Sequence, residues 1–240
     1  MKRRCDDFTL VELLVVICLA SLLFGIVLPA FSRMVTGSAV DRLASNLKLR
    51  LEQTQSHAAS SRRHVALILP SGADSTDTKL DAARLGGSRM CYVDWDSDNY
   101  KATFVDWVSD EDWTQPERGA FLIGVYKSDP IKDDGTLKKK GTGEGEIYYA
   151  VSRTGALVSE TSGNDKPLKD VGSFPGGDKN NCAVVFSPKG YVRTSGKEIF
   201  LVVAEASDSG TELLFPGGAP HNFKALRINP VNGRVRYFSK

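Results

Sequence analysis

The sequence lacks the residue patterns of the common catalytic sites. No HExxH, GxSxG or phosphate-binding glycine loop occurs in its 240 residues, and no CxxC pair is available for zinc or dithiol redox chemistry. The three histidines are His57, His64 and His221, and the four cysteines are Cys5, Cys18, Cys91 and Cys182. We therefore expect a protein that is not an enzyme and that needs no cofactor.

Acidic residues are absent from the last 28 positions, which follow Glu212. The basic residues of this tail are Lys224, Arg227, Arg234, Arg236 and Lys240. The whole chain is nearly neutral, with a net charge of +2, and 41% of its residues are hydrophobic. This composition is typical of a folded protein, and its net charge indicates no particular partner.

Charge is also absent from the 18 residues between Leu13 and Ala30. As a helix they would be about 27 Å long, close to the ~30 Å hydrocarbon core of a bilayer. Residues 2–4 are basic and predict a cytoplasmic N-terminus, with everything after Arg33 outside. A cleaved secretory signal peptide is the less favoured alternative, because its apolar core is shorter and ends in a small-x-small site.

One carboxylate, Glu12, lies inside the apolar stretch that follows Asp7. A charge in the apolar part of a membrane helix costs on the order of 3 kcal/mol on insertion scales, so it is usually paired. The chain has no cation between Arg4 and Arg33. Either another molecule supplies the cation, or Glu12 lies near enough to the membrane surface to reach water.

Beyond the apolar run, a second helical pattern follows, in which buried-type residues recur every three or four positions. This face consists of Val40, Leu43, Leu47, Leu51, Thr54 and Ala58, and the other side carries Asp41, Arg42, Lys48, Arg50, Glu52 and Gln53. A transmembrane helix, residues 8–31, is thus expected to continue as an amphipathic helix, residues 32–63, with a kink at Pro29. The amphipathic part needs a surface to pack on.

The stretch FTLVELLVV, residues 8–16, resembles the N-terminal methylation motif of type IV pilins and of the pseudopilins of type II secretion. The resemblance implies that a prepilin peptidase removes a leader, residues 1–7, by cutting between Asp7 and Phe8. Phe8 would then be N-methylated, and Glu12 would neutralise the N-terminal amine of a neighbouring subunit during filament assembly. Pro29 matches the kink proline of many pilins.

The cleavage site departs from the family pattern, which normally has Gly-Phe where this chain has Asp7-Phe8. A carboxylate in place of glycine can impair cleavage. Without cleavage Phe8 has no free amine for Glu12 to neutralise. The alternative is then an uncleaved single-pass protein with a membrane-anchored domain.

Three later stretches look like the minor pseudopilins called H in secretion systems and their fimbrial T relatives. They are ASNLKLRLEQTQSHAASSRRHVALIL, VVFSPKGYVRTSGKEIFLVV and ALRINPVNGRVRYF. In the fimbrial T relatives a similar GRxR tail is associated with DNA binding during uptake. Arg234 and Arg236, two apart on a predicted strand, are the candidate DNA-binding residues here, although an ordinary solvated hairpin is the favoured interpretation.

Short strand patterns divided by turn residues fill residues 64–240. They are 64–69, 90–95, 102–108, 120–126, 146–151, 182–187, 191–194, 198–205, 223–229 and 234–238. Polar, glycine-rich stretches at 71–79, 128–145 and 160–181 are expected to be loops, and Pro188-Lys189-Gly190 and Asn232-Gly233 to be turns. The expected fold is α+β and pilin-like, with the long N-terminal helix packed on a β-rich C-terminal domain.

Two further sites in this domain have open interpretations. If the domain is exported to an oxidising compartment, Cys91 and Cys182 form either a disulfide or two buried thiols. Asp94, Asp96 and Asp98 resemble the first half of a calcium loop, but Asn99 and Val105 stand where such a loop needs Gly and Glu. A half-buried strand that enters a turn is the favoured account of these aspartates.

Taken together, these features predict a minor pilin-like subunit of a type II secretion pseudopilus or a type IV pilus. Its expected partners are other pilins or pseudopilins in a filament, the prepilin peptidase and the bacterial inner membrane. The C-terminal domain would be periplasmic, and the protein could enter the filament. A DNA-binding minor pilin and an uncleaved anchored domain are the alternatives.

Overall fold

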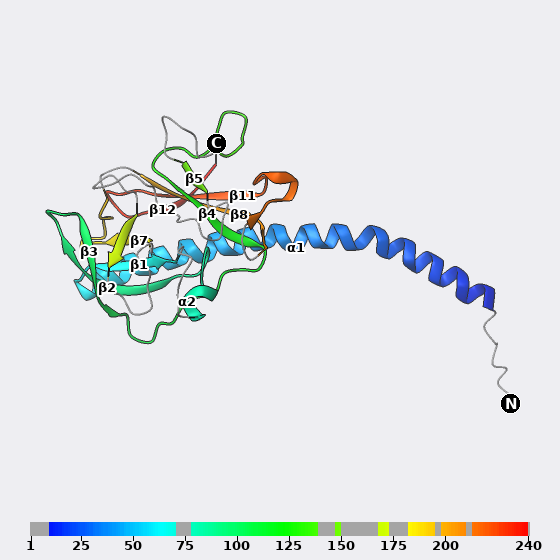
Figure 1. Ribbon diagram of the computed structural model, residues 1–240, viewed down its shortest axis with the longest axis horizontal. Coiled ribbons are helices and arrows are strands. Elements are labelled where there is room, and N and C mark those ends of the chain that lie inside the picture. Colours follow the sequence, from blue (N-terminus) through cyan, green and yellow to red (C-terminus); the bar gives the residue numbers. More distant parts are fainter. Residues whose placement is uncertain are drawn as a thin grey trace.

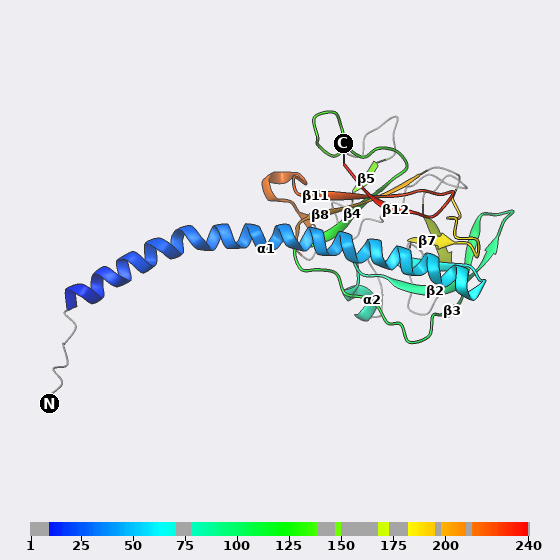
Figure 2. The ribbon, with the colours of Figure 1, turned by 180° about the vertical axis from the view of Figure 1, so that it is seen from behind.

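A single long helix, α1 (Leu10–Ser61), dominates the fold. The computed structural model describes residues 10–70, 78–138, 147–149, 168–172, 182–194, 198–209 and 213–239. With 52 residues, α1 is about 78 Å long. Its first half projects from a β-rich head and its second half lies along that head (Figures 1 and 2). The helix ends where Arg62 takes a left-handed φ of 54°, close to the predicted end at residue 63.

The head consists of short strands that mostly lie where the sequence predicts them. They are β1 (Val65–Leu69), β2 (Arg89–Asp96), β3 (Lys101–Trp107), β4 (Ala120–Tyr126), β5 (Ile147–Tyr149), β6 (Lys169–Gly172), β7 (Cys182–Phe186), β8 (Ile199–Glu205), β9 (Ser207–Asp208), β10 (Leu213–Leu214), β11 (Phe223–Ile228) and β12 (Val235–Phe238). A short helix, α2 (Thr78–Ala82), and a 3-10 turn, η1 (Pro216–Gly218), complete the described elements.

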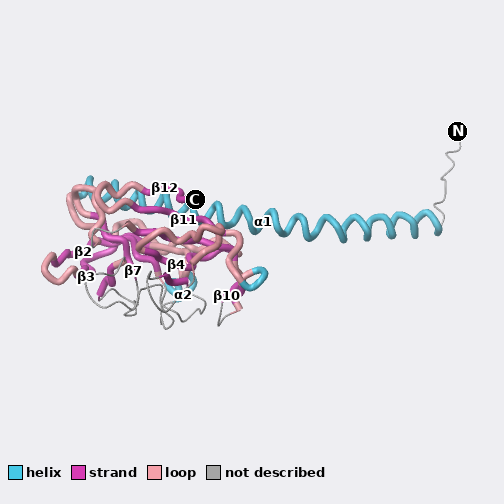
Figure 3. Tube along the Cα trace, turned by 90° about the horizontal axis from the view of Figure 1, so that it is seen from above, coloured by secondary structure: helices cyan, strands magenta, loops and turns pink. Residues whose placement is uncertain are grey.

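Two sheets pack on α1. Strands β1, β2, β3, β6 and β7 close into a small barrel, and the order β12-β11-β8-β4-β5 forms an open five-stranded sheet. All of these strand pairs are antiparallel except β3 with β6. Both sheets contact the second half of α1 (Figure 3). The predicted α+β class with a long N-terminal helix packed on a β-rich domain is confirmed.

The buried face of α1 is the one that the sequence predicts. Val40, Leu43, Leu47, Leu51, Thr54 and Ala58 are each at most 2% exposed. Strand β1 is buried on both faces, because Val65, Leu67 and Leu69 join the main core while Ala66 and Ile68 fill the barrel. Burial on both sides explains its uninterrupted apolar sequence, VALIL.

Two predictions about the head are wrong. Residues 191–194 pair with β7 only through a single bridge between Phe186 and Val192, because the Thr194 amide already donates to the Val192 carbonyl and turns the chain away from β7. Lys169–Gly172 was expected to be loop, but it forms β6 between β3 and β7. Its sequence, KDVG, has little strand propensity, so the pairing depends on tertiary neighbours.

Candidate functional site

The projecting half of α1 is the largest apolar surface among the described residues. Its large apolar side chains are between 48% and 81% exposed: Leu10, Val11, Leu13, Leu14, Val15, Val16, Ile17, Leu19, Leu22, Leu23, Phe24 and Val27. Soluble monomers rarely expose a continuous apolar surface of this kind, and such surfaces mark protein or membrane contacts. Within the described part of the chain, no helix includes a stretch both long and apolar enough to cross a membrane.

The carboxylate of Glu12 lies in the first turn of α1 and is exposed. A negative charge at this position is favourable by about 0.3–1 kcal/mol, since it faces the positive end of the helix dipole. The expected cleavage and methylation residues, Asp7 and Phe8, lie outside the described residues. So does the side chain of Pro29, although α1 continues through that position. Their roles therefore stay predictions.

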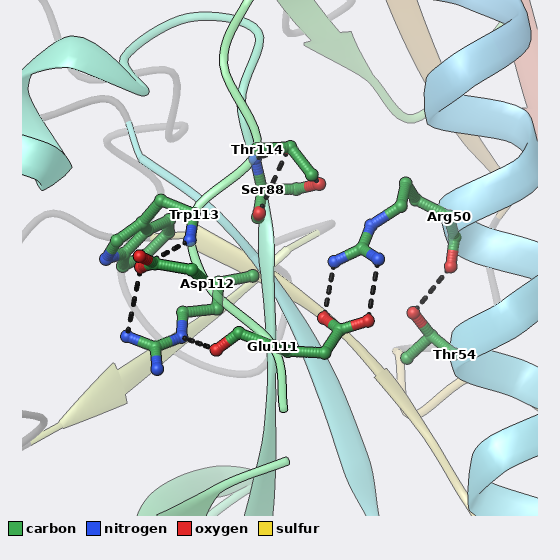
Figure 4. Close-up of polar contacts among 8 residues, drawn as sticks. Arg50, Thr54, Ser88, Glu111, Asp112, Trp113 and Thr114 are labelled. Carbon is green, nitrogen blue, oxygen red and sulfur yellow. Dashed lines mark hydrogen bonds and ion pairs between the residues drawn. The ribbon is translucent and has the colours of Figure 1, made fainter. Parts of the chain in front are cut away.

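A bidentate ion pair fixes the second half of α1 to the loop after β3. Arg50 donates from its two terminal nitrogens to the Glu111 carboxylate at 2.7 and 2.5 Å (Figure 4). Both side chains are less than one fifth exposed. The sequence pattern placed Arg50 on the solvent side of the helix, so this contact was missed. No local signal links two residues that are 61 positions apart.

A second polar contact joins α1 to the turns that the sequence predicts. Gln55 donates from Nε2 to the carbonyl oxygens of Gly190 at 2.8 Å and Asn232 at 2.7 Å. Gly190 and Gly233 both have positive φ, as expected for turn glycines, with values of 82° and 64°. One glutamine on α1 thus holds the β7 turn and the β11–β12 loop together.

The predicted DNA-binding residues, Arg234 and Arg236, line a cavity of about 370 Å³ on strands β11 and β12. Arg227 lines the same cavity, because it lies directly opposite Arg236 in the strand register. Arg227 forms an ion pair with Glu198, and this contact raises the pKa of its guanidinium. The structure therefore brings three arginines together, one more than the sequence motif identifies.

The calcium candidates end a strand and begin a turn, as the favoured interpretation predicts. Strand β2 ends at Asp96, whose Oδ1 accepts from the Asp98 and Asn99 amides. Its Oδ2 accepts from Asn99 Nδ2 at 2.7 Å. Asp96 therefore closes the hairpin turn itself, and its pKa is lowered chiefly by the Asn99 side-chain hydrogen bond. No group of three potential metal ligands occurs within the described ranges.

Of the two outcomes that the sequence leaves open for Cys91 and Cys182, the structure has two buried thiols and no disulfide between them, because the fold keeps the two residues apart. They flank β1 on opposite sides, with Cys91 opposite Ala66 and Cys182 opposite Leu69. Two strand spacings and an offset of three residues separate their Cα atoms by roughly 14 Å, twice the disulfide limit. The two residues also lie in different clusters of the core, and burial raises the pKa of the Cys91 thiol to about 12.

Comparison with known proteins gives one structural likeness. No protein-family model matches the chain, and no curated protein matches it. Among solved structures, the chain is similar to the minor pseudopilin EpsH from the Type 2 Secretion System of Vibrio cholerae. The identity is 15%, the likeness covers 84% of this chain and 96% of that chain, and the TM-score is 0.34. A likeness of this degree carries no functional assignment, which therefore rests on the geometry of the chain itself.

Proposed function

We propose that the chain is a minor pilin-like structural subunit of a type II secretion pseudopilus or a type IV pilus. The observation that carries the proposal is the projecting half of α1, whose apolar side chains are exposed from Leu10 to Val27. Complete burial of an exposed side chain of this size is favourable by about 1.5–3 kcal/mol of transfer free energy. A filament core made of the same half-helices, or a bilayer before assembly, would provide that burial.

The N-terminal segment supports assembly of the pilin type in particular. Residues 8–16 resemble the pilin methylation motif, and Glu12 lies in the first turn of the projecting helix. In the proposed filament, the Glu12 carboxylate pairs with the amine of a neighbour's cleaved and methylated Phe8. The basic leader and the apolar run support insertion in the inner membrane, with the head in the periplasm. The head would then stay outside the bilayer while the projecting half of α1 moves from the bilayer into the filament core.

We predict that Glu12→Leu abolishes assembly and leaves the head folded. A photo-crosslinking amino acid at Leu22 should capture neighbouring pilin helices in a bacterial host that makes the filament. Loss of the Glu12 carboxylate should reduce these adducts by at least about tenfold, because an intermolecular charge pair in an apolar environment has no substitute. The matched control is Glu52→Gln, which removes an exposed carboxylate from the half of α1 that lies on the head.

Two results of this experiment would contradict the proposal. Adducts that are unchanged in Glu12→Leu would show that the carboxylate takes no part in assembly. A full-length mass from Met1 to Lys240, with membrane association and no adducts, would show the uncleaved single-pass anchor instead. Cleavage and methylation should give a mature chain that begins at N-methylated Phe8.

A second candidate function, DNA binding, is favoured by the three arginines that share one cavity. Arg234 and Arg236 are exposed, and neither forms an ion pair within the described part of the chain. We expect Arg234→Gln with Arg236→Gln to weaken DNA binding of the full chain in detergent about tenfold. The plot of log affinity against log salt concentration should become less steep by about 1.8, since two phosphate contacts are lost.

The control for the DNA experiment removes the same charge elsewhere. Arg62→Gln with Lys189→Gln changes two exposed cations outside the cavity and should leave the gel shift unchanged. Absence of any shift for the unaltered chain at low salt would eliminate this function. Equal losses in both double variants would indicate a diffuse charge effect without a site.

A further inference from the structure

An aromatic cleft lies on the head, away from the projecting half of α1 and on the other side of the β11–β12 loop residues that line the arginine cavity. It has a volume of about 470 Å³ and forms where the β2–β3 hairpin, residues 191–194 and the β11–β12 loop meet. Strands β2 and β3 lie at the end of the head farthest from the start of α1 (Figure 1). The side chains used below are those of Trp95, Tyr100, Tyr191, Arg193, Thr194 and Val231.

The cation in this cleft, Arg193, forms cation–π contacts with two aromatic rings. Its guanidinium lies 4.9 Å from the centre of the Tyr191 ring and 5.6 Å from that of Trp95. Its Nε and Nη2 point to His64 Nε2 at 3.3 and 3.2 Å. Burial, and then the Arg193 charge, lower the pKa of His64, so a neutral imidazole accepts from the guanidinium. The charge of Asp94 acts in the opposite direction on the pKa of His64, and within the described ranges no carboxylate forms an ion pair with Arg193.

A second polar group in the cleft has an unmet hydrogen bond. The Thr194 hydroxyl is buried and has no hydrogen-bond partner among the residues that the structure describes. A buried hydroxyl without a partner is unfavourable, and such groups in folded proteins usually meet a water or a ligand. Arg193 and Thr194 both line the cleft, and a change of the Thr194 χ1 rotamer would turn its covered hydroxyl toward a ligand there. Together they suit an acceptor that carries negative charge.

The apolar part of the cleft is exposed to a partner. Val231 is 81% exposed and Tyr100 is 41% exposed, and the Trp95 and Tyr100 rings meet edge to face at 6.3 Å. Tryptophan, tyrosine and arginine are the residues that dominate binding energy in protein interfaces. The residues that line the cleft include neither Asp nor Glu. The nearby Asp96 uses both carboxylate oxygens in its own turn.

We infer that this cleft binds a short extended segment of another protein that carries a carboxylate beside an apolar side chain. The carboxylate accepts from Arg193 and from the Thr194 hydroxyl, and the apolar side chain lies against Trp95 and Tyr100. A cavity of this volume holds two or three residues of an extended chain. The inference goes beyond a role in filament assembly and does not depend on it, since α1 contributes no residue to the cleft.

Fluorescence anisotropy with two matched peptides tests the inference on the full chain in detergent. The probes are fluorescein-labelled acetyl-Leu-Glu-Leu-amide and the same peptide with Gln in place of Glu. We expect the Glu peptide to bind about tenfold more tightly, because a charge-assisted hydrogen bond is roughly twice as strong as a neutral one. Arg193→Gln should remove this preference, and Thr194→Val should weaken the Glu peptide about threefold without loss of thermal stability.

The control variant is Arg62→Gln, which removes an exposed arginine that does not line the cleft and should leave both affinities unchanged. Equal binding of the two peptides, or no binding of either at 10 mM (roughly the weakest affinity expected for so small a ligand), overturns the inference. A preference that survives Arg193→Gln and Thr194→Val overturns it too. Binding of cellobiose in place of both peptides would assign the cleft to glycans and likewise overturn it.

Discussion

Replacing Gly233 with alanine is expected to lower the free energy of unfolding by about 2–5 kcal/mol. Gly233 has a φ of 64°, which costs a residue with a Cβ about 1–2 kcal/mol. The new Cβ would also lie 2.2 Å from the Gly190 carbonyl oxygen and 2.5 Å from Gln55 Nε2. Relieving that overlap must separate the β11–β12 loop from the β7 turn and from α1, at a further cost of about 1–3 kcal/mol.

Gly135→Ala separates the two causes of this loss. Gly135 has a similar φ of 78°, but nothing lies within 4 Å of the position that its Cβ would take. Alanine there should cost only the conformational part, about 1 kcal/mol. Urea unfolding of both full-length variants in detergent, followed by far-UV circular dichroism, gives the comparison. Equal midpoints for the two variants would mean that Gln55 does not hold the two turns against α1.

Glu111→Gln is expected to lower the free energy of unfolding by about 2–3 kcal/mol. The substitution leaves the Arg50 guanidinium only 16% exposed and without its anion. Among the described residues Arg50 pairs with no other carboxylate, and its buried Nε already lacks a hydrogen bond. The loss is smaller than for a fully buried pair because both side chains keep some contact with water.

Two further variants serve as controls for the Glu111→Gln prediction. Glu52→Gln breaks a pair with Lys48 whose side chains are 47% and 33% exposed, and it should change stability by no more than about 0.5 kcal/mol. Arg50→Met combined with Glu111→Leu removes both charges and should recover most of the loss, because no uncompensated cation remains. If Glu111→Gln and Glu52→Gln behave alike in urea unfolding, the Arg50–Glu111 pair is not a buried contact in solution.

Helix α1 was predictable because its signal is local and repeated. The steps of three and four from Val40 to Ala58 recur over several turns, and each residue on that face is buried. The strands of the head followed from apolar alternation between turn residues such as Gly190 and Gly233. By contrast, β6 was missed, because KDVG becomes a strand only when β3 and β7 lie on either side of it.

The residues of the candidate sites were also predictable only where they lie on one element. The sequence alone placed Glu12 in an apolar helix and identified Arg234 and Arg236, since spacing along one element is visible in a linear pattern. Only the tertiary structure added Arg227 to those arginines and joined Arg193 to Trp95, because register and packing decide which distant residues meet.

The same division explains why the sequence left the state of the cysteines open. The sequence showed that Cys91 and Cys182 are the two cysteines of the head, and burial of both was one of its two expected outcomes. The order β2-β1-β7 then set one strand between them, and the register placed them on different faces of the barrel wall. Sequence periodicity thus determined which residues are buried, whereas strand order and register, which depend on contacts between distant segments, decided which residues are neighbours.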